Sequence, residues 1–209
     1  MMTKERTRDA DQTRQRILVA AEDQFALKGF YGARIDDIAK QAKINKRMIY
    51  AYFGNKEALY KKVLYHVYQK LDQAEKEILD QHLEGRELIS AIIHLYFDFL
   101  QKNPNFVSIL MWENLNKAAD LKQLPKEDLK RELFDVIREE IKKGQVSGIF
   151  RPLLDAEQVT ISLILVCFAN FSNSYTMSCL FGRDLTSQAA IEEREKQTMD
   201  MVLSWLCGN

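Results

Sequence analysis

The sequence predicts an all-α protein in two parts, an N-terminal three-helix head and a larger helical body. Apolar residues recur at steps of three and four along most of the 209 residues, which is the spacing of one helix face. Only 8 Gly and 3 Pro interrupt the chain, so its helices should be long, and we find no strand of convincing alternation. With 46% hydrophobic residues, the chain can bury a sizeable core.

The first predicted helix runs from about residue 13 to residue 28. Ile17 and Phe25 lie on its apolar face. Gly29 should end it, because glycine tolerates the left-handed conformation that often follows a helix. The residues before about 12 are polar, and we expect them to be disordered.

A helix-turn-helix is predicted within residues 29–56. Apolar residues at helical spacing indicate its first helix, and a short polar break precedes the second. Asn45 suits the N-cap of that second helix, because its side chain can accept a hydrogen bond from an unpaired backbone N–H. Lys46 and Arg47 follow at once. A helix-turn-helix places such a short helix in the major groove of DNA.

Six further helices are predicted in the body. Their approximate ranges are 55–84, 86–102, 106–112, 125–141, 155–178 and 187–206. Residues 160–182 carry no charge, but polar residues interrupt them, so the apolar piece is too short for a bilayer that needs about 20 apolar residues. A buried helix is the better interpretation.

The charge of the chain is unevenly distributed. The formal net charge is zero, which alone argues against a nucleic-acid partner. Residues 1–62, however, hold 14 Lys and Arg against 8 Asp and Glu, whereas residues 63–209 hold 16 against 22. This asymmetry indicates a basic, DNA-facing module joined to an acidic body.

Enzymes, metal proteins and secreted proteins are disfavoured by what the sequence lacks. We find no nucleophile motif, phosphate loop or catalytic carboxylate pair, and the three His show no metal-type pairing. The three Cys are odd in number, and the charged N-terminus lacks an apolar signal segment. We therefore expect a cytoplasmic protein with reduced thiols, no enzymatic activity, no cofactor, no metal and no membrane association.

Residues 29–59 resemble the DNA-binding region of the TetR/AcrR family of transcriptional regulators. Order and spacing agree without a gap at Gly29–Phe30, Ile38–Ala39, Ala42, Ile44, Lys46, Ile49–Tyr50, Tyr52–Phe53, Asn55–Lys56–Glu57 and Leu59. This similarity covers only the first third of the chain. The remainder resembles the family in being a helical body, for which the family implies ligand binding and dimerisation. The predicted domains are therefore 1–58 and 59–209.

The chain departs from the family pattern at three positions. Ala33 replaces a frequent Thr, so the usual cap of the second helix is lost. Lys43 replaces a frequent Gly in the turn and must adopt a less comfortable backbone conformation. Arg47 stands where a small residue is frequent, a change that bears on sequence preference rather than on fold.

The helix-turn-helix pattern and the resemblance together predict a set of DNA-contacting residues. The set is Arg34, Asn45, Lys46, Arg47, Met48, Tyr50, Tyr52 and Lys56. Arg47 can pair bidentately with guanine, although a phosphate contact is about as strongly expected. The family implies phosphate contacts for Tyr50, Tyr52 and Lys56, with core packing as the alternative for Tyr50. For the cations at the start of the helix, the alternative is a solvated face.

A second predicted set would line a small-molecule pocket in the body. Its members are Phe97, Met111, Trp112, Cys167, Asn170, Phe171 and Tyr175. Aromatic walls with a few polar groups are typical of such pockets. For any single one of these residues, packing in the core is the alternative.

The function predicted from these observations is that of a homodimeric, ligand-responsive DNA-binding regulator. We expect a repressor that a small-molecule effector releases from a palindromic operator. The last two predicted helices would pair with those of a second subunit. The alternative is a helical protein–protein interaction module whose head does not read DNA specifically.

Overall fold

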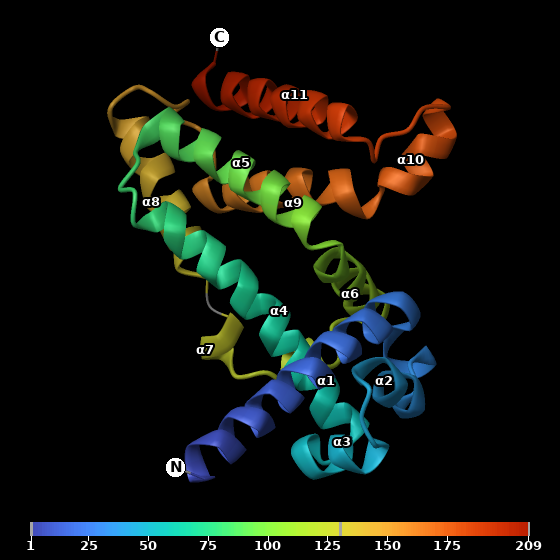
Figure 1. Ribbon diagram of the computed structural model, residues 1–209. Coiled ribbons are helices and arrows are strands. Elements are labelled where there is room, and N and C mark those ends of the chain that lie inside the picture. Colours follow the sequence, from blue (N-terminus) through green and yellow to red (C-terminus); the bar gives the residue numbers. More distant parts are fainter. Residues whose placement is uncertain (1, 130, 209) are drawn as a thin grey trace. The chain divides into compact units, whose positions relative to one another are not determined.

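The computed structural model describes residues 2–129 and 131–208, with side chains from residue 9 onward. Every regular element in these ranges is a helix, which confirms the all-α class (Figure 1). The elements are α1 (Met2–Gly32), α2 (Ile35–Ala42), α3 (Lys46–Phe53), α4 (Lys56–Leu79), α5 (Gly85–Lys102), α6 (Pro104–Leu115), the 3₁₀ turn η1 (Leu121–Gln123), α7 (Lys126–Leu129), α8 (Glu132–Val146), α9 (Ala156–Ser172), α10 (Ser174–Phe181) and α11 (Gln188–Cys207).

The first helix is longer than the sequence predicted. It begins at Met2, whereas we expected disorder up to about residue 12. Residues 2–12 include Lys, Arg, Glu, Ala and Gln, which favour helix, and they continue a helix already nucleated by its packed residues. Gly29 interrupts the helix with φ 67° and ψ 176°, as predicted.

The caps and the turn of the helix-turn-helix bear out the local predictions. Arg34 is the N-cap of α2 and makes no capping hydrogen bond through its side chain. Lys43 adopts the left-handed conformation, with φ 54° and ψ 48°. The Asn45 side chain caps α3 by accepting a hydrogen bond from the Arg47 backbone N–H at 2.9 Å.

Replacing Lys43 with glycine should stabilise the protein by about 1 kcal/mol, because glycine adopts positive φ without the steric cost of a Cβ atom. The free energy of unfolding in urea would show this gain. Lys43→Ala is the matched control, since it removes the same charge but keeps the Cβ atom. An equal effect of both variants would assign the gain to charge rather than to the backbone.

The contacts divide the chain into two compact units. The head unit comprises Met1–Gln69 with Ser108–Leu129, and the body unit comprises Lys70–Val107 with Lys130–Asn209. Residues 108–129 therefore belong to the same unit as the helix-turn-helix, although the sequence placed them in the body. Apolar spacing shows which face of α6 is buried but not which helices cover it. The boundary at residues 58 and 59 stays a prediction.

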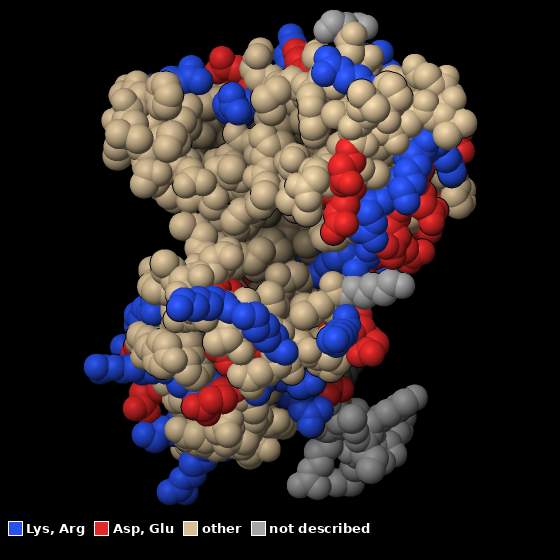
Figure 2. All heavy atoms as spheres, turned by 180° about the vertical axis from the view of Figure 1, so that it is seen from behind, with Lys and Arg blue, Asp and Glu red and all other residues tan. Residues whose placement is uncertain are grey.

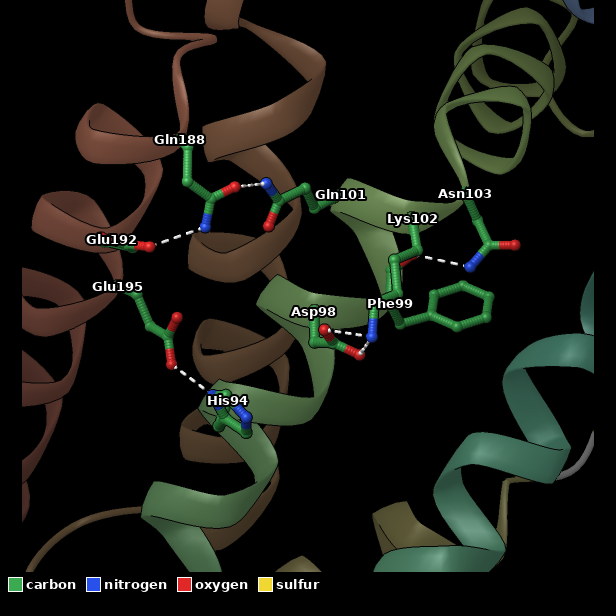
Figure 3. A network of polar contacts seen from close by, with 9 residues as sticks. All are labelled: His94, Asp98, Phe99, Gln101, Lys102, Asn103, Gln188, Glu192 and Glu195. Atoms are coloured by element: carbon green, nitrogen blue, oxygen red, sulfur yellow. Dashed lines mark hydrogen bonds and ion pairs between the residues drawn. The ribbon is translucent and has the colours of Figure 1, made fainter.

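In the body unit, α5 is packed against α8, α9 and α11. Its buried side chains come from most of its circumference, as predicted, and include Leu88, Ile89, Ile92, Ile93, Tyr96, Phe97, Phe99 and Leu100. Polar contacts also join α5 to α11 (Figure 3). His94 Nδ1 lies 2.7 Å from Glu195 Oε1, and the Gln101 amide donates to Gln188.

The uncharged segment forms two helices rather than the single predicted one. The chain bends by 66° between α9 and α10. At the bend, the Asn173 side chain donates to the Ala169 carbonyl oxygen and the Ser172 hydroxyl, which offers the backbone an alternative to continued helix. No single helix of residues 2–129 and 131–208 is both long and apolar enough to cross a bilayer, while α9 and α10 meet that test only jointly, as a bent pair.

Candidate nucleic-acid interface

The second helix of the helix-turn-helix, α3, is held by its apolar side and exposes its cationic start. Ile49 is fully buried, and α2 packs beneath with Ile38 and Ala42 buried. Lys46 and Arg47 are exposed on the first turn of α3. A short helix anchored in this way presents its first turn to a partner, as recognition helices do in the major groove.

Lys46 is engaged by the other helix of the motif. Its ammonium group lies 2.9 Å from Asp36 Oδ1 on α2. The hydrogen bond to Asp36 raises the pKa of Lys46, so this cation is shared with a carboxylate before any DNA arrives. Arg47, by contrast, has no ion pair within residues 9–129 and 131–208. The guanidinium of Arg47 is therefore the more available of the two charges.

Tyr52 carries a partner that sequence reasoning missed. The Arg14 guanidinium of α1 lies 5.2 Å from the centroid of the Tyr52 ring, a cation–π contact between two helices. Arg14 thus adds a cation beside the predicted phosphate contact. The contact joins residues that are far apart in the sequence, so no local spacing could have revealed it.

The remaining predicted DNA contacts are also placed by the structure. Tyr50 is 48% exposed, which favours the surface over its alternative role in the core. Met48 is half-buried on α3, and Arg34 is exposed at the N-cap of α2. The Lys56 ammonium lies 4.8 Å from the centroid of the Phe30 ring, and burial lowers the pKa of Lys56.

Charge and apolar surface gather on different elements. Figure 2 shows many Lys and Arg side chains on the surface of the head unit, with acidic side chains among them. In the body unit, the surface of α10 in this view is free of charged side chains. Residues 158–182 contain no Lys, Arg, Asp or Glu, so this surface is uncharged by sequence.

The residues predicted to bind a ligand belong to both units, and their role stays a prediction. In the body unit, Phe97 and Phe171 are in edge-to-face contact, with ring centroids 5.5 Å apart. Cys167 is buried, and burial raises the pKa of its thiol to about 12. Asn170 accepts a hydrogen bond from Arg194 Nε at 3.0 Å. These four residues belong to α5 and α9.

The other three predicted ligand-binding residues lie elsewhere. Met111 and Trp112 belong to the head unit, where the Trp112 indole N–H donates to the Ala26 carbonyl oxygen at 3.1 Å. Tyr175 is 78% exposed on α10. Aromatic and sulfur-containing residues marked positions of interest in the sequence, but their distribution between units could not be read from it. Within residues 9–129 and 131–208, no group of three or more His, Cys, Asp or Glu side chains is placed to hold a metal ion.

The anchored α3, its capped start and its exposed cations define a helix-turn-helix DNA-binding protein. The sequence matches the family "Bacterial regulatory proteins, tetR family" over residues 17–63 and "Tetracyclin repressor-like, C-terminal domain" over residues 86–202. The chain therefore belongs to the TetR family of transcriptional regulators, and it is a DNA-binding regulator.

Named relatives and solved structures agree with this membership. The transcriptional repressor NicS of Pseudomonas putida is 34% identical over 186 residues, 88% of each chain. The repressor SCO4008 of Streptomyces coelicolor is 32% identical over 168 residues, 79% of this chain and 80% of the relative. A transcriptional regulator of Saccharomonospora viridis, solved in complex with choline, shares the fold with a TM-score of 0.75 at 18% identity, covering 94% of this chain and 98% of the other.

Proposed function

We propose that this regulator is a homodimeric repressor that holds a palindromic operator through α3 and leaves it when a small-molecule effector binds the body unit. The observation that carries the proposal is the first turn of α3. It is fixed to the head by buried Ile49 and capped by Asn45, and it exposes the Arg47 guanidinium without an ion pair among the described residues. The proposed repressor acts in the cytoplasm on double-stranded DNA.

Apolar exposure on the last helices supports the homodimer. The exposed apolar side chains of α9, α10 and α11 are Ile161, Leu165, Tyr175, Leu180, Phe181 and Met201. Exposed apolar surface often marks a protein–protein interaction site. We infer that residues 155–178 and 187–206, which form α9, part of α10 and α11, pair with their counterparts in a second subunit. Two heads would then reach successive major grooves, about 34–36 Å apart.

Release of the operator requires an effector that distinguishes two conformers. An effector shifts an equilibrium only by its difference in affinity for the two states. The effector would bind the body unit and favour a conformer in which the heads are wrongly spaced. The long α4, which has one end in each unit, would transmit the change. Phe97, Phe171 and Asn170 are the candidate contacts in the body.

Lys46→Ala and Tyr52→Phe should each weaken operator binding while leaving the dimer intact. Each variant removes a polar contact with DNA at both half-sites, and one such contact contributes about 1 kcal/mol, or roughly fivefold per half-site. Titration of an operator duplex and sedimentation of the free protein measure the two properties.

The matched control is Lys40→Ala, which removes an exposed cation of α2 that is outside the predicted contacts. It should bind the operator like the wild type. Dissociation of the dimer in the Lys46 or Tyr52 variant would show that the substituted residue acts in assembly, and would remove it from the DNA-contacting set.

The alternative function is a helical interaction module whose head does not read DNA. It predicts that none of these substitutions changes DNA binding, because there would be no specific binding to change. The dependence of DNA affinity on salt concentration also separates the two functions. A head that neutralises phosphates loses affinity steeply as salt rises, whereas a head that does not bind DNA shows no such fall.

A further inference from the structure

Residues 108–115 of α6 are part of the head unit. The division of the chain falls after Gln69 in α4 and after Val107 in α6, so each helix has one end in each unit. Inside the head unit, α6 makes two contacts that bear on the position of the helix-turn-helix.

The first of these contacts joins α6 to α4 through a buried hydrogen bond. The Tyr60 hydroxyl donates to Glu113 Oε1 at 2.8 Å, and Tyr60 and Glu113 are 1% and 2% exposed. The other carboxylate oxygen of Glu113 accepts the Leu121 backbone N–H at 3.0 Å. Burial and the neighbouring Glu113 raise the pKa of Tyr60, so its hydroxyl remains a donor.

The second contact joins α6 to the end of α1. Besides donating its indole N–H to the Ala26 carbonyl, Trp112 lies over Gly29. A Cβ atom at Gly29 would lie 2.8 Å from the Trp112 ring, so the ring occupies space that only glycine leaves open. The kink of α1 and the position of the Trp112 ring thus both depend on Gly29. Phe25 of α1 also packs edge-on against the Tyr60 ring, with centroids 4.8 Å apart.

These contacts allow α6 few intermediate positions. Adjacent residues of a helix point about 100° apart, so rotation of α6 would remove Glu113 from Tyr60 and Trp112 from Gly29 together. A buried carboxylate that loses a donor is strongly disfavoured unless it finds another. Loss of one contact should therefore entail loss of the other.

We propose that Tyr60, Glu113 and Trp112 form a catch that positions the helix-turn-helix for operator binding. The proposal rests on the proposed function, because it assumes operator binding. The three side chains are positioning residues, and none belongs to the α3 surface that faces DNA. Operator binding and the made catch should favour each other, since coupling between two sites is reciprocal.

Tyr60→Phe tests the catch, with Tyr96→Phe as its matched control. Tyr96 donates to Glu75 Oε1 at 2.7 Å and is likewise buried, but this pair lies within the body unit. Both variants remove one hydroxyl from a buried tyrosine–carboxylate pair. Operator affinity and backbone hydrogen exchange of residues 108–121, with and without operator duplex, are measured on the full-length proteins below their unfolding temperatures.

In the wild type, the operator should slow exchange in residues 108–121, which contain no predicted DNA contact. Tyr60→Phe should lose this protection and bind the operator about tenfold more weakly, with an unchanged salt dependence because the phosphate contacts remain. Tyr96→Phe should keep both properties. If Tyr60→Phe does not fold, Trp112→Phe removes the bond to Ala26 while keeping an aromatic ring, and the same loss of protection is expected.

Two results would overturn the catch alone: a wild type that binds its operator without protecting residues 108–121, or equal protection in the Tyr60 and Tyr96 variants. A wild type that binds no operator would instead overturn the proposed function and the catch with it. The two failures are therefore distinguishable in one set of measurements.

Discussion

Raising the salt concentration from about 50 to about 200 mM should weaken operator binding about a thousandfold. Arg34, Arg47 and Lys56 are the predicted cationic contacts of each head, or about six in a dimer, and each cation that neutralises a phosphate releases counterions. The slope of log affinity against log salt should then be about −5. Lys46 is left out of this estimate because Asp36 offsets the charge of its ammonium group, so its predicted hydrogen bond to DNA should add little to counterion release.

Fluorescence anisotropy of a labelled operator across salt concentrations measures the slope. Asp36→Asn is an informative variant, because it frees Lys46 for phosphate and should steepen the slope by up to about two units per dimer. A slope near zero, with the wild type and this variant alike, would favour the interaction module that does not read DNA.

Arg47→Ala should reduce affinity for the operator by about 1–3 kcal/mol at each half-site, or roughly fivefold to 150-fold. The guanidinium lies at the first turn of α3, where recognition helices meet base edges, and no described ion pair restrains it. A bidentate contact with guanine would also be lost, so preference at one symmetric pair of operator positions should relax. Binding to every single-base variant of the operator measures both effects.

The two possible partners of Arg47 give different results in this experiment. A base contact predicts that the variant loses discrimination at one position of each half-site, whereas a phosphate contact predicts uniform weakening across sequences and a shallower salt slope. Lys40→Ala removes an equal charge from α2 and should do neither. Wild-type affinity and preference in Arg47→Ala would remove this residue from the interface.

Features that depend on neighbours in sequence were predicted well. Asn45 caps α3 because its side chain reaches an N–H two residues away, and Gly29 breaks α1 through its own backbone freedom. Lys43 takes positive φ because the tight turn demands it of whichever residue stands there. Each of these three features depends on residues within about one helical turn of it. Local sequence patterns carry information over that range.

Features that depend on contacts between helices were not predicted. Lys46 and Asp36 belong to different helices, as do Arg14 and Tyr52, and neither spacing nor composition pairs them. Trp112 was predicted to line a ligand pocket because it is aromatic, and that role stays a prediction, but no pattern in the sequence indicated its contact with Gly29 in the head unit. The sequence shows that an apolar side chain favours burial, but tertiary packing decides which residues cover it.

The charge pattern located the basic module, but it overstated how many of its cations are free of a carboxylate partner. Fourteen cations in residues 1–62 correctly marked the basic part of the chain. Within it, Lys46 is paired with Asp36 and Lys28 with Asp37, so part of that charge is neutralised inside the head unit.

The central claim is that this chain is a dimeric regulator that reads a palindrome through α3. Selection of random duplex DNA on the purified wild-type protein at physiological salt tests it most directly. A dimeric regulator of this kind should enrich a palindrome whose half-sites are centred one helical turn, about 34–36 Å, apart. Failure to enrich any sequence, at low salt as well and with protein stripped of bound small molecules, would contradict it.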